Sequence, residues 1–261
     1  MATPEAEDHI DDQPMPLLDH LIELRRRLLW SMVALLLCFF FCYYFSANIF
    51  DFLARPLASV LEAQGGSKHM IYTHLTEAFF TYIKVAFFGA ACISFPVIAS
   101  QIWLFVAPGL YRSEKRAFAP FLIATPVLFI MGAALCYYFI FPVAWQFFAS
   151  FQSVGGGGGV AIDLEPKVGE YLDLVMKLIF AFGVAFQLPV ALSLMAKVGI
   201  VRSTQLTKFR RYAYVGMFII AAILAPPDVI TQTGLAVPLI GLYELSIIAA
   251  RIVEPKRDPE D

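Results

Sequence analysis

A carboxylate set among arginines precedes the first apolar run of the chain, and it is the first group there that could do chemistry. Within residues 20–28, His20, Glu23 and Arg27 are three and four residues apart, so a helix places them on one side. Leucines take another side of that helix: Leu17, Leu21, Leu24 and Leu28. One interpretation is local: Glu23 pairs with Arg27 for about 0.2–0.5 kcal/mol, and the arginines only flank a membrane span. The other is that Glu23 is held at a membrane edge to bind a cation.

Glu114 is a second carboxylate on the same predicted side of the membrane, next to Lys115 and Arg116. A single carboxylate in a loop is ordinarily just solvated. Two of them could form an acidic clasp, because a carboxylate accepts a planar guanidinium through two charge-assisted hydrogen bonds. A ligand with two adjacent arginines would need two such acceptors, here Glu23 and Glu114.

The composition is that of an integral membrane protein. Of the 261 residues, 59% are hydrophobic and 15% are charged, with a mean hydropathy of +0.71; soluble domains average about 45–50% apolar and about 25% charged residues. A net charge of −2 without a basic stripe argues against a nucleic-acid partner. The four cysteines and four histidines show no metal, redox or triad spacing, so we expect no metal, no cofactor and no enzymatic activity.

The apolar runs predict an all-α membrane domain over residues 17–251, between an acidic, disordered tail (1–16) and a C-terminal tail (252–261). Prolines inside the runs predict several bent helices. Residues 46–76 are expected to form a partly structured loop outside the membrane. Most of the 19 lysines and arginines would flank one side, which places both termini in the cytoplasm. The six predicted spans are 28–45, 78–106, 117–149, 171–196, 212–225 and 229–250.

The fifth predicted span is short. Its 14 residues rise only about 21 Å at 1.5 Å per residue, whereas the hydrocarbon core is about 30 Å thick. Either the bilayer is thinned beside the fifth and sixth spans, or flanking residues such as Phe209 and Val229 lengthen the helix.

Polar groups in or beside the spans need partners, because a charge at a helix centre costs about 2.5–3.5 kcal/mol on insertion scales. Gln187, just before Pro189, either satisfies a kinked helix or offers a polar spot to a partner or substrate. Glu244 is expected to reach the inner interface near Arg251, and Asp228 to cap the sixth helix. At the outer ends of the second and fourth spans we expect either a structural network of ion pairs or a polar floor to a groove, formed by Glu77, Lys84, Glu170, Asp173 and Lys177.

Several motifs spread over almost the whole chain are together highly specific. They are residues 20–28 (HLIELRRRL), Glu77-Ala-Phe79 with Lys84, Phe95-Pro96, 103–111 (WLFVAPGLY) leading to 114–116, 139–142 (FIFP), 182–189 (FGVAFQLP) and Pro226-Pro227-Asp228. In these motifs the chain resembles the TatC family, the polytopic receptor subunit of the bacterial twin-arginine protein translocase.

The resemblance implies a glove-shaped, six-helix fold in the bacterial inner membrane. It implies binding of the twin-arginine signal peptide of folded cargo at the cytoplasmic face, with transport driven by the proton gradient. The implied peptide-binding residues are Glu23, Glu114, Leu24, Arg25, Arg27 and Phe105. The implied partners are the single-span subunits TatA and TatB, docking near the fifth and sixth spans, and further copies of the chain. The outer-side and docking candidates are Pro56, Gln187, Asp228, Gln232, Ile223 and Leu224.

The sequence departs from the family at one position, and it leaves one alternative function open. Members of the family often carry Glu where this chain has Gln187, so no charge-based role is expected there. A secondary transporter for ions or small solutes is the alternative function: polar Gln187 and Glu244 favour it, and the lack of matching interrupted helices argues against it. The sequence holds no nucleotide-binding loop, so energy must enter elsewhere.

Overall fold

The computed structural model describes residues 17–63, 69–106, 115–152, 164–224 and 229–254. Nearly all of these residues are helical, and the one β-type contact among them is an isolated bridge between Ile71 and Lys167. The predicted disordered tail, Glu114 and Asp228 lie outside the described ranges.

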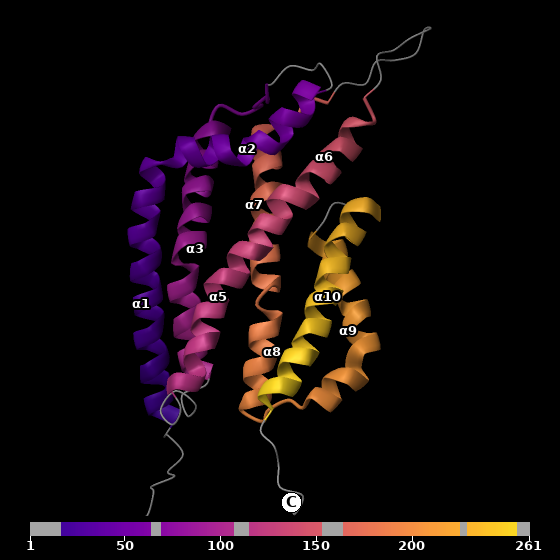
Figure 1. The fold of residues 1–261 in the computed structure, drawn as a ribbon. Helices are drawn as coiled ribbons and strands as arrows, with labels where there is room; N and C mark the ends of the chain where they lie inside the picture. Colours follow the sequence, from indigo (N-terminus) through magenta and orange to yellow (C-terminus); the bar gives the residue numbers. More distant parts are fainter. Residues whose placement is uncertain (1–16, 64–68, 107–114, 153–163, 225–228, 255–261) are drawn as a thin grey trace, which may run out of the picture.

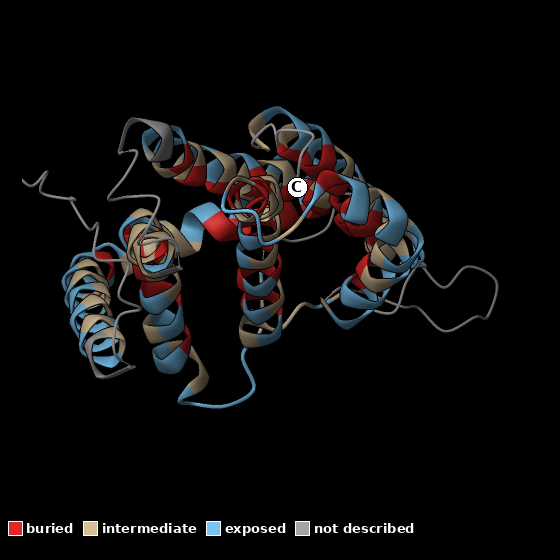
Figure 2. Ribbon diagram, turned by 90° about the horizontal axis from the view of Figure 1, so that it is seen from below, coloured by how far each residue is buried: buried red, intermediate tan, exposed pale blue. Residues whose placement is uncertain are grey.

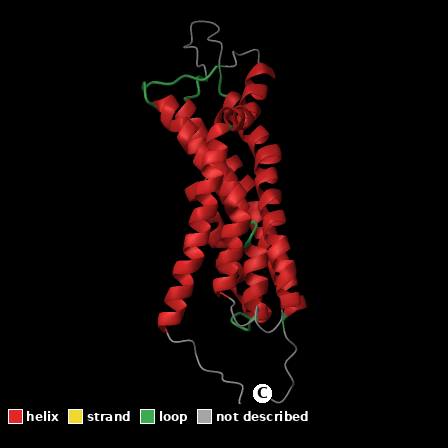
Figure 3. Cartoon of the chain, turned by 90° about the vertical axis from the view of Figure 1, so that its left-hand side faces the viewer, coloured by secondary structure: helices red, strands yellow, loops and turns green. Residues whose placement is uncertain are grey.

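Apart from α2, which lies across one end of the molecule, the helices run between its two ends, and the start of α1 and the end of α10 lie at the same end (Figure 1). The view in Figure 3 shows the connecting segments gathered mainly at these two ends. We call the end where α1 begins and α10 finishes the α1 N-terminal end, and the opposite end, which α2 covers, the α2 end. In order, the elements are α1 Leu17–Tyr44, α2 Ser46–Ala63, α3 Glu77–Val106, α5 Lys115–Leu135, the π-helical turn η1 Cys136–Ile140, α6 Phe141–Ala149, α7 Val168–Ala185, α8 Leu188–Lys197, α9 Ser203–Leu224 and α10 Val229–Val253.

Five helical stretches in the described ranges are long and apolar enough to cross a membrane: His20–Tyr44, Glu77–Phe105, Ala119–Ala149, Val168–Lys197 and Thr231–Val253. The fifth predicted span corresponds to α9, which is not among these five stretches and whose first half carries Lys208, Arg210 and Arg211. It has 22 residues, which rise about 33 Å. The helix thus begins nine residues before the predicted start of the span at residue 212, and it includes Phe209, as in the second of the two alternatives.

The segment 46–76, predicted as a partly structured loop, begins with a full helix, α2 Ser46–Ala63. Pro56 lies inside this helix, is buried, and has no N–H to give to the carbonyl of Phe52. The Tyr137 hydroxyl donates to that carbonyl instead, at 2.7 Å. The Tyr171 hydroxyl donates to the neighbouring carbonyl of Leu53 at 2.8 Å. Two tyrosines from distant spans thus stabilise a proline-containing helix across the α2 end.

Prolines bend the third and fourth spans as predicted. The third contains the π-helical turn just before Pro142, a common way to absorb an irregular helical register. The fourth is interrupted between Ala185 and Leu188, next to Pro189.

The core surrounds α7, and α1 lies at the periphery. In the most apolar 18-residue stretch of α7 and α8, 50% of the residues are buried, whereas in that of α1 only 6% are. Helix α1 lies at the left edge of Figures 1 and 2.

The helices α5 and α7 cross very closely. A Cβ at Gly132 would lie 2.6 Å from the carbonyl oxygen of Phe182, and one at Gly183 would lie 2.5 Å from the Phe129 ring. Glycines allow such close approach of two helices in a membrane, where packing drives their association.

Candidate functional site

Glu23 lies at the α1 N-terminal end and is held by Arg27. Its Oε1 accepts a hydrogen bond from Arg27 Nε at 2.9 Å and another from Arg27 Nη2. Arg27 Nη1 also donates to Gln101 Oε1 on α3 at 3.4 Å. The Glu23 and Arg27 side chains are 24% and 21% exposed. The local pair considered from the sequence is therefore present, and α3 fixes its orientation.

An aromatic contact ties the same two helices together next to this pair. The ring of His20 stacks on that of Phe105, with centroids 4.3 Å apart and planes at 21°. Phe105 lies one helical turn beyond Gln101, just as His20 lies near Glu23 on α1. The predicted polar side of α1 thus faces α3.

The leucine side of α1 faces away from the protein. Leu21, Leu24 and Leu28 are 59%, 42% and 61% exposed. Arg25 is exposed as well. In a membrane the leucines contact lipid, which is as apolar as they are, so the stripe anchors the helix without building a core.

The bonding at Glu23 leaves acceptor capacity. A carboxylate has two oxygens with about four lone-pair sites, and both bonds from Arg27 go to Oε1. Within the described ranges, no donor reaches Oε2. A further guanidinium could bind that oxygen without displacing Arg27. The structure does not place Glu114, but α5 begins at the next residue, Lys115, at the same end of the molecule (Figure 1).

The α2 end carries the predicted polar network. Glu77 accepts from three backbone N–H groups: Thr73 at 2.9 Å, His74 at 3.4 Å and Gly169 at 3.0 Å. Gly169 is the second residue of α7, and Thr73 and His74 precede α3. The Glu77 carboxylate therefore joins the start of α7 to the segment before α3. Three lysines complete the network: Lys84 pairs with Asp173 at 2.7 Å, Lys167 pairs with Glu170 at 3.2 Å, and Lys177 donates to the Ile223 carbonyl at 3.1 Å.

Gln187 is buried at the break between α7 and α8. Its Nε2 donates to the carbonyl of Thr125 on α5 at 3.0 Å. This bond joins α5 to the kinked span, while Oε1 has no hydrogen-bond partner. The amide therefore satisfies a helix carbonyl and retains an acceptor.

The remaining docking candidates lie on α9 and α10. Ile223 is 68% exposed, whereas Leu224 packs partly against the core. Gln232 is partly exposed, and its Nε2 lies 3.5 Å from the Phe218 carbonyl of α9. The α9–α10 hairpin ends well short of the level reached by α6 and α7 (Figure 1).

Glu244 has different partners from those expected. It binds Arg210 at 2.6 Å and the Tyr214 hydroxyl at 2.5 Å, while Arg251 lies 3.4 Å from Thr207 Oγ1. Arg210 and Tyr214 are four residues apart, a spacing that could have identified them as a pair facing one acceptor. Gln101 was also missed, although it is one turn before Phe105.

Comparison with known proteins gives one consistent answer. A family model described as "TatC: Sec-independent protein translocase protein (TatC)" matches residues 19–238. The Sec-independent protein translocase protein TatC of Magnetococcus marinus is 50% identical over 250 residues, which cover 96% of this chain and 89% of that one. The TatC of Rickettsia prowazekii is 46% identical over 239 residues, covering 92% and 94%. A solved structure, "Crystal Structure of Twin Arginine Translocase Receptor- TatC", matches with a TM-score of 0.75 at 38% identity, covering 90% of this chain and 99% of that chain.

Proposed function

This chain belongs to the TatC family of Sec-independent protein translocase proteins, a core component of that translocation system, and from this premise we propose that its α1 N-terminal end binds the twin-arginine signal peptide of folded cargo. It is a multi-pass membrane protein with a transport role rather than a catalytic one. We place it in the bacterial inner membrane with this end in the cytoplasm, because the basic residues concentrate there. The proton gradient supplies the energy in this proposal.

The observation that carries the proposal is the partly used carboxylate of Glu23. Arg27 binds it through Oε1, a contact of the kind that a visiting guanidinium would make, and no donor from the described residues occupies Oε2. A guanidinium placed beside Arg27 would experience like-charge repulsion. A second carboxylate is therefore needed for an arginine pair, and Glu114, immediately before α5, is the proposed source.

The neighbouring residues supply the rest of the proposed surface. Phe105, stacked on His20, gives an apolar and aromatic wall beside the carboxylate. Leu24 is exposed to lipid on the same turn of α1, so apolar residues of the visiting peptide can remain in the bilayer while its arginines reach Glu23. We assign Arg25 to the inner headgroup layer and Arg27 to the orientation of Glu23.

The chain works within a translocase complex, and we propose that TatA-type and TatB-type single-span subunits dock on α9 and α10, with further copies of the chain completing the receptor. Exposed apolar side chains on both helices support this surface, among them Ile219, Ile223 and Val237. Gln232 adds a polar group there. Gln187 is buried together with its Oε1, so a partner would reach it only if α5 or α7 moved; Pro56 and Asp228 are assigned to the outer side.

The test is photocrosslinking of a twin-arginine peptide, and of its twin-lysine variant, to the full chain in lipid nanodiscs. Glu23→Gln removes the charge but keeps the shape. Because a hydrogen bond to a charged group contributes about 1.5–3 kcal/mol, binding of the twin-arginine peptide should weaken by about 10–100-fold. Glu114→Gln should do the same from the second position.

The matched control is Glu254→Gln, since Glu254 is a carboxylate at the same end of the molecule but on the α10 side, where it accepts from Ser203 at 2.6 Å. It should leave peptide binding unchanged. Unchanged binding in the Glu23 and Glu114 variants, singly and together, would refute the proposal. Solute flux into liposomes that hold only this chain would favour the transporter alternative.

A further inference from the structure

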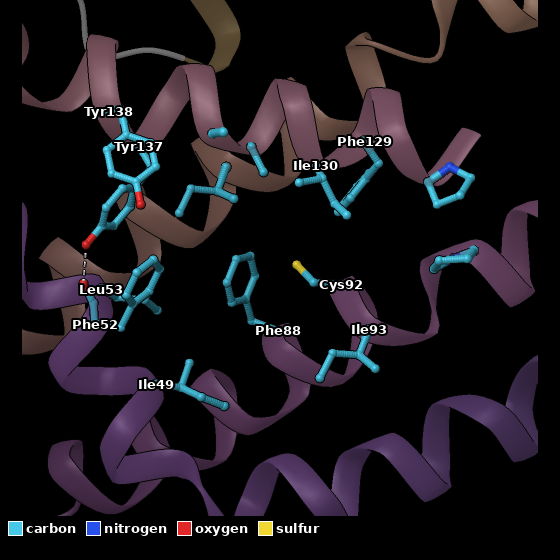
Figure 4. A pocket seen from close by; sticks show the side chains of 15 residues that line it. Ile49, Phe52, Leu53, Phe88, Cys92, Ile93, Phe129, Ile130, Tyr137 and Tyr138 are labelled. Atoms are coloured by element: carbon cyan, nitrogen blue, oxygen red, sulfur yellow. Dashed lines mark hydrogen bonds between the residues drawn. The ribbon is translucent and has the colours of Figure 1, made fainter. Parts of the chain in front are cut away.

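A large apolar cavity lies directly below α2, between α3 and α5. Its volume is 520 Å³, within the range of about 300–1,000 Å³ that is typical of small-molecule sites. Figure 4 shows Phe88, Cys92 and Ile93 of α3 facing Phe129 and Ile130 of α5 across the space. Apart from the tyrosine hydroxyls and one thiol, the lining side chains are hydrocarbon.

The cavity has a closed floor and an open mouth. Phe129 and Ile179 are almost fully buried and form the floor, and Leu53 of α2, equally buried, lies on the covered side. Ile93 and Ile130 are 54% and 66% exposed, and they stand at the edge that opens between α3 and α5. Since these helices cross the membrane, the mouth faces lipid tails rather than water.

The rim beneath α2 carries a polar group, the Tyr137 hydroxyl. The rings of Phe52 and Tyr137 are stacked, with centroids 4.4 Å apart, and the Tyr137 hydroxyl is bonded to the Phe52 carbonyl. Arg55, three residues after Phe52 on α2, is exposed and lies on a neighbouring position of the same helix face. No carboxylate in the described parts of the chain forms an ion pair with Arg55.

We propose that this cavity is a phospholipid site, in which one acyl chain fills the space between α3 and α5 and the lipid phosphate binds Arg55. The lining matches an acyl chain in polarity, and the cation lies at the rim where the headgroup would be. A guanidinium binds phosphate through two charge-assisted hydrogen bonds. An empty space of this size would forfeit the dispersion contacts of its whole lining.

The occupant is a lipid from the leaflet on the α2 side, because α2 covers the cavity from that side and Arg55, the one basic residue of α2, lies at that rim. A peptide segment would need partners for its backbone N–H and C=O groups unless it were helical, and the lining offers almost none. The proposal does not depend on signal-peptide binding.

The experiment uses the full chain in vesicles of phosphatidylethanolamine and phosphatidylglycerol that contain a trace of phospholipid with a diazirine midway along one acyl chain. After illumination, crosslinked positions are mapped by mass spectrometry. Crosslinks should concentrate at Phe88, Cys92 and Ile130 and be sparse at Ile248, an equally apolar residue that faces lipid on α10.

Two substitutions test the cavity itself. Ile130→Trp places a bulky ring at the mouth without disturbing buried contacts, and crosslinking at Cys92 should fall severalfold. The control is Ile123→Trp, two turns earlier on α5, outside the cavity and 67% exposed; it should change nothing.

A third substitution tests the headgroup contact. Arg55→Gln should lower lipid retention after detergent extraction by about tenfold, the loss expected for a charge-assisted bond, whereas Arg55→Lys should retain most of it. Lys167→Gln, a cation at the same end that is paired with Glu170, is the control. Because Arg55 is exposed, this arm remains informative if Ile130→Trp fails to fold.

Crosslinks spread evenly over all lipid-facing helices would overturn the proposal. So would a twin-arginine peptide or a single-span partner helix that crosslinks to Cys92 and displaces the lipid, because the cavity would then be a protein-binding groove.

Discussion

Glu23 and Glu77 are two glutamates at opposite ends of the molecule, and their bonding differs in kind. Glu77 uses both oxygens, and all three of its donors are backbone N–H groups from two separate segments. Glu23 uses one oxygen, and its donor is a single flexible side chain, Arg27.

The difference separates a carboxylate held by the backbone from one held by a side chain. Backbone donors move only if the chain itself moves, so the bonds of Glu77 fix the segment before α3 against α7. A side-chain donor can rotate or share its acceptor, so the binding of a second cation that we propose at Glu23 would require no backbone movement. Sequence position does not reveal this distinction, since each glutamate stands at the start of an apolar run.

The largest expected effect tests the structural side of this comparison. Glu77→Ala removes the acceptor for Thr73, His74 and Gly169, so the segment before α3 should detach from α7. Hydrogen exchange of residues 71–77 and of Gly169 should accelerate severalfold, with a lower midpoint of thermal unfolding. Twin-arginine peptide binding, measured in parallel, should stay unchanged; a loss as large as in Glu23→Gln would erase the distinction.

A smaller effect is expected from Arg27→Lys. Lysine keeps the charge beside Glu23 but cannot form the forked contact with Glu23 and Gln101. Loss of one ordinary hydrogen bond costs about 0.5–1.5 kcal/mol, so peptide affinity should fall by about 2–10-fold. Binding isotherms in nanodiscs measure this, and Arg26→Lys, at an exposed neighbouring position, is the control. An effect equal to that of Glu23→Gln would mean that Arg27 is itself the main binding group.

The smallest effect concerns the ion pair between Lys84 and Asp173. Both side chains are about half exposed, at 51% and 52%, and exposed pairs contribute about 0–1 kcal/mol. A double-mutant cycle with Lys84→Met and Asp173→Asn should therefore give a coupling of about 0.5 kcal/mol in the free energy of unfolding. A coupling several times larger would show that ion pairs, and not the backbone bonds of Glu77, hold the α2 end together.

Much of the fold could be predicted from composition and periodicity. Six apolar runs, the prolines that bend them and the shared side of the two termini all follow from local rules. The start of α9 was misplaced because Lys208, Arg210 and Arg211 suggest a solvated loop, yet Arg210 is drawn into the helix pair by Glu244. That bond joins residues 34 apart, and only the folded arrangement creates it.

The candidate site was predictable in part. The spacing of His20, Glu23 and Arg27 correctly places them on one side of a helix, but it does not say what that side faces. Gln101 and Phe105 become its neighbours only through the packing of α1 on α3. The leucines at helical spacing would indicate a core in a soluble protein; here they face lipid, since exposure to a bilayer carries no penalty for an apolar residue.

The bonds that complete α2 also constrain the order in which the chain can assemble. Phe52 and Leu53 are made early, whereas the hydroxyls that satisfy their carbonyls belong to Tyr137 and Tyr171. As the ribosome delivers the chain from its N-terminus, α2 must wait at the membrane surface with these carbonyls solvated until the third and fourth spans have been inserted. The cover over this end of the molecule can therefore close only after four of the six spans are in place.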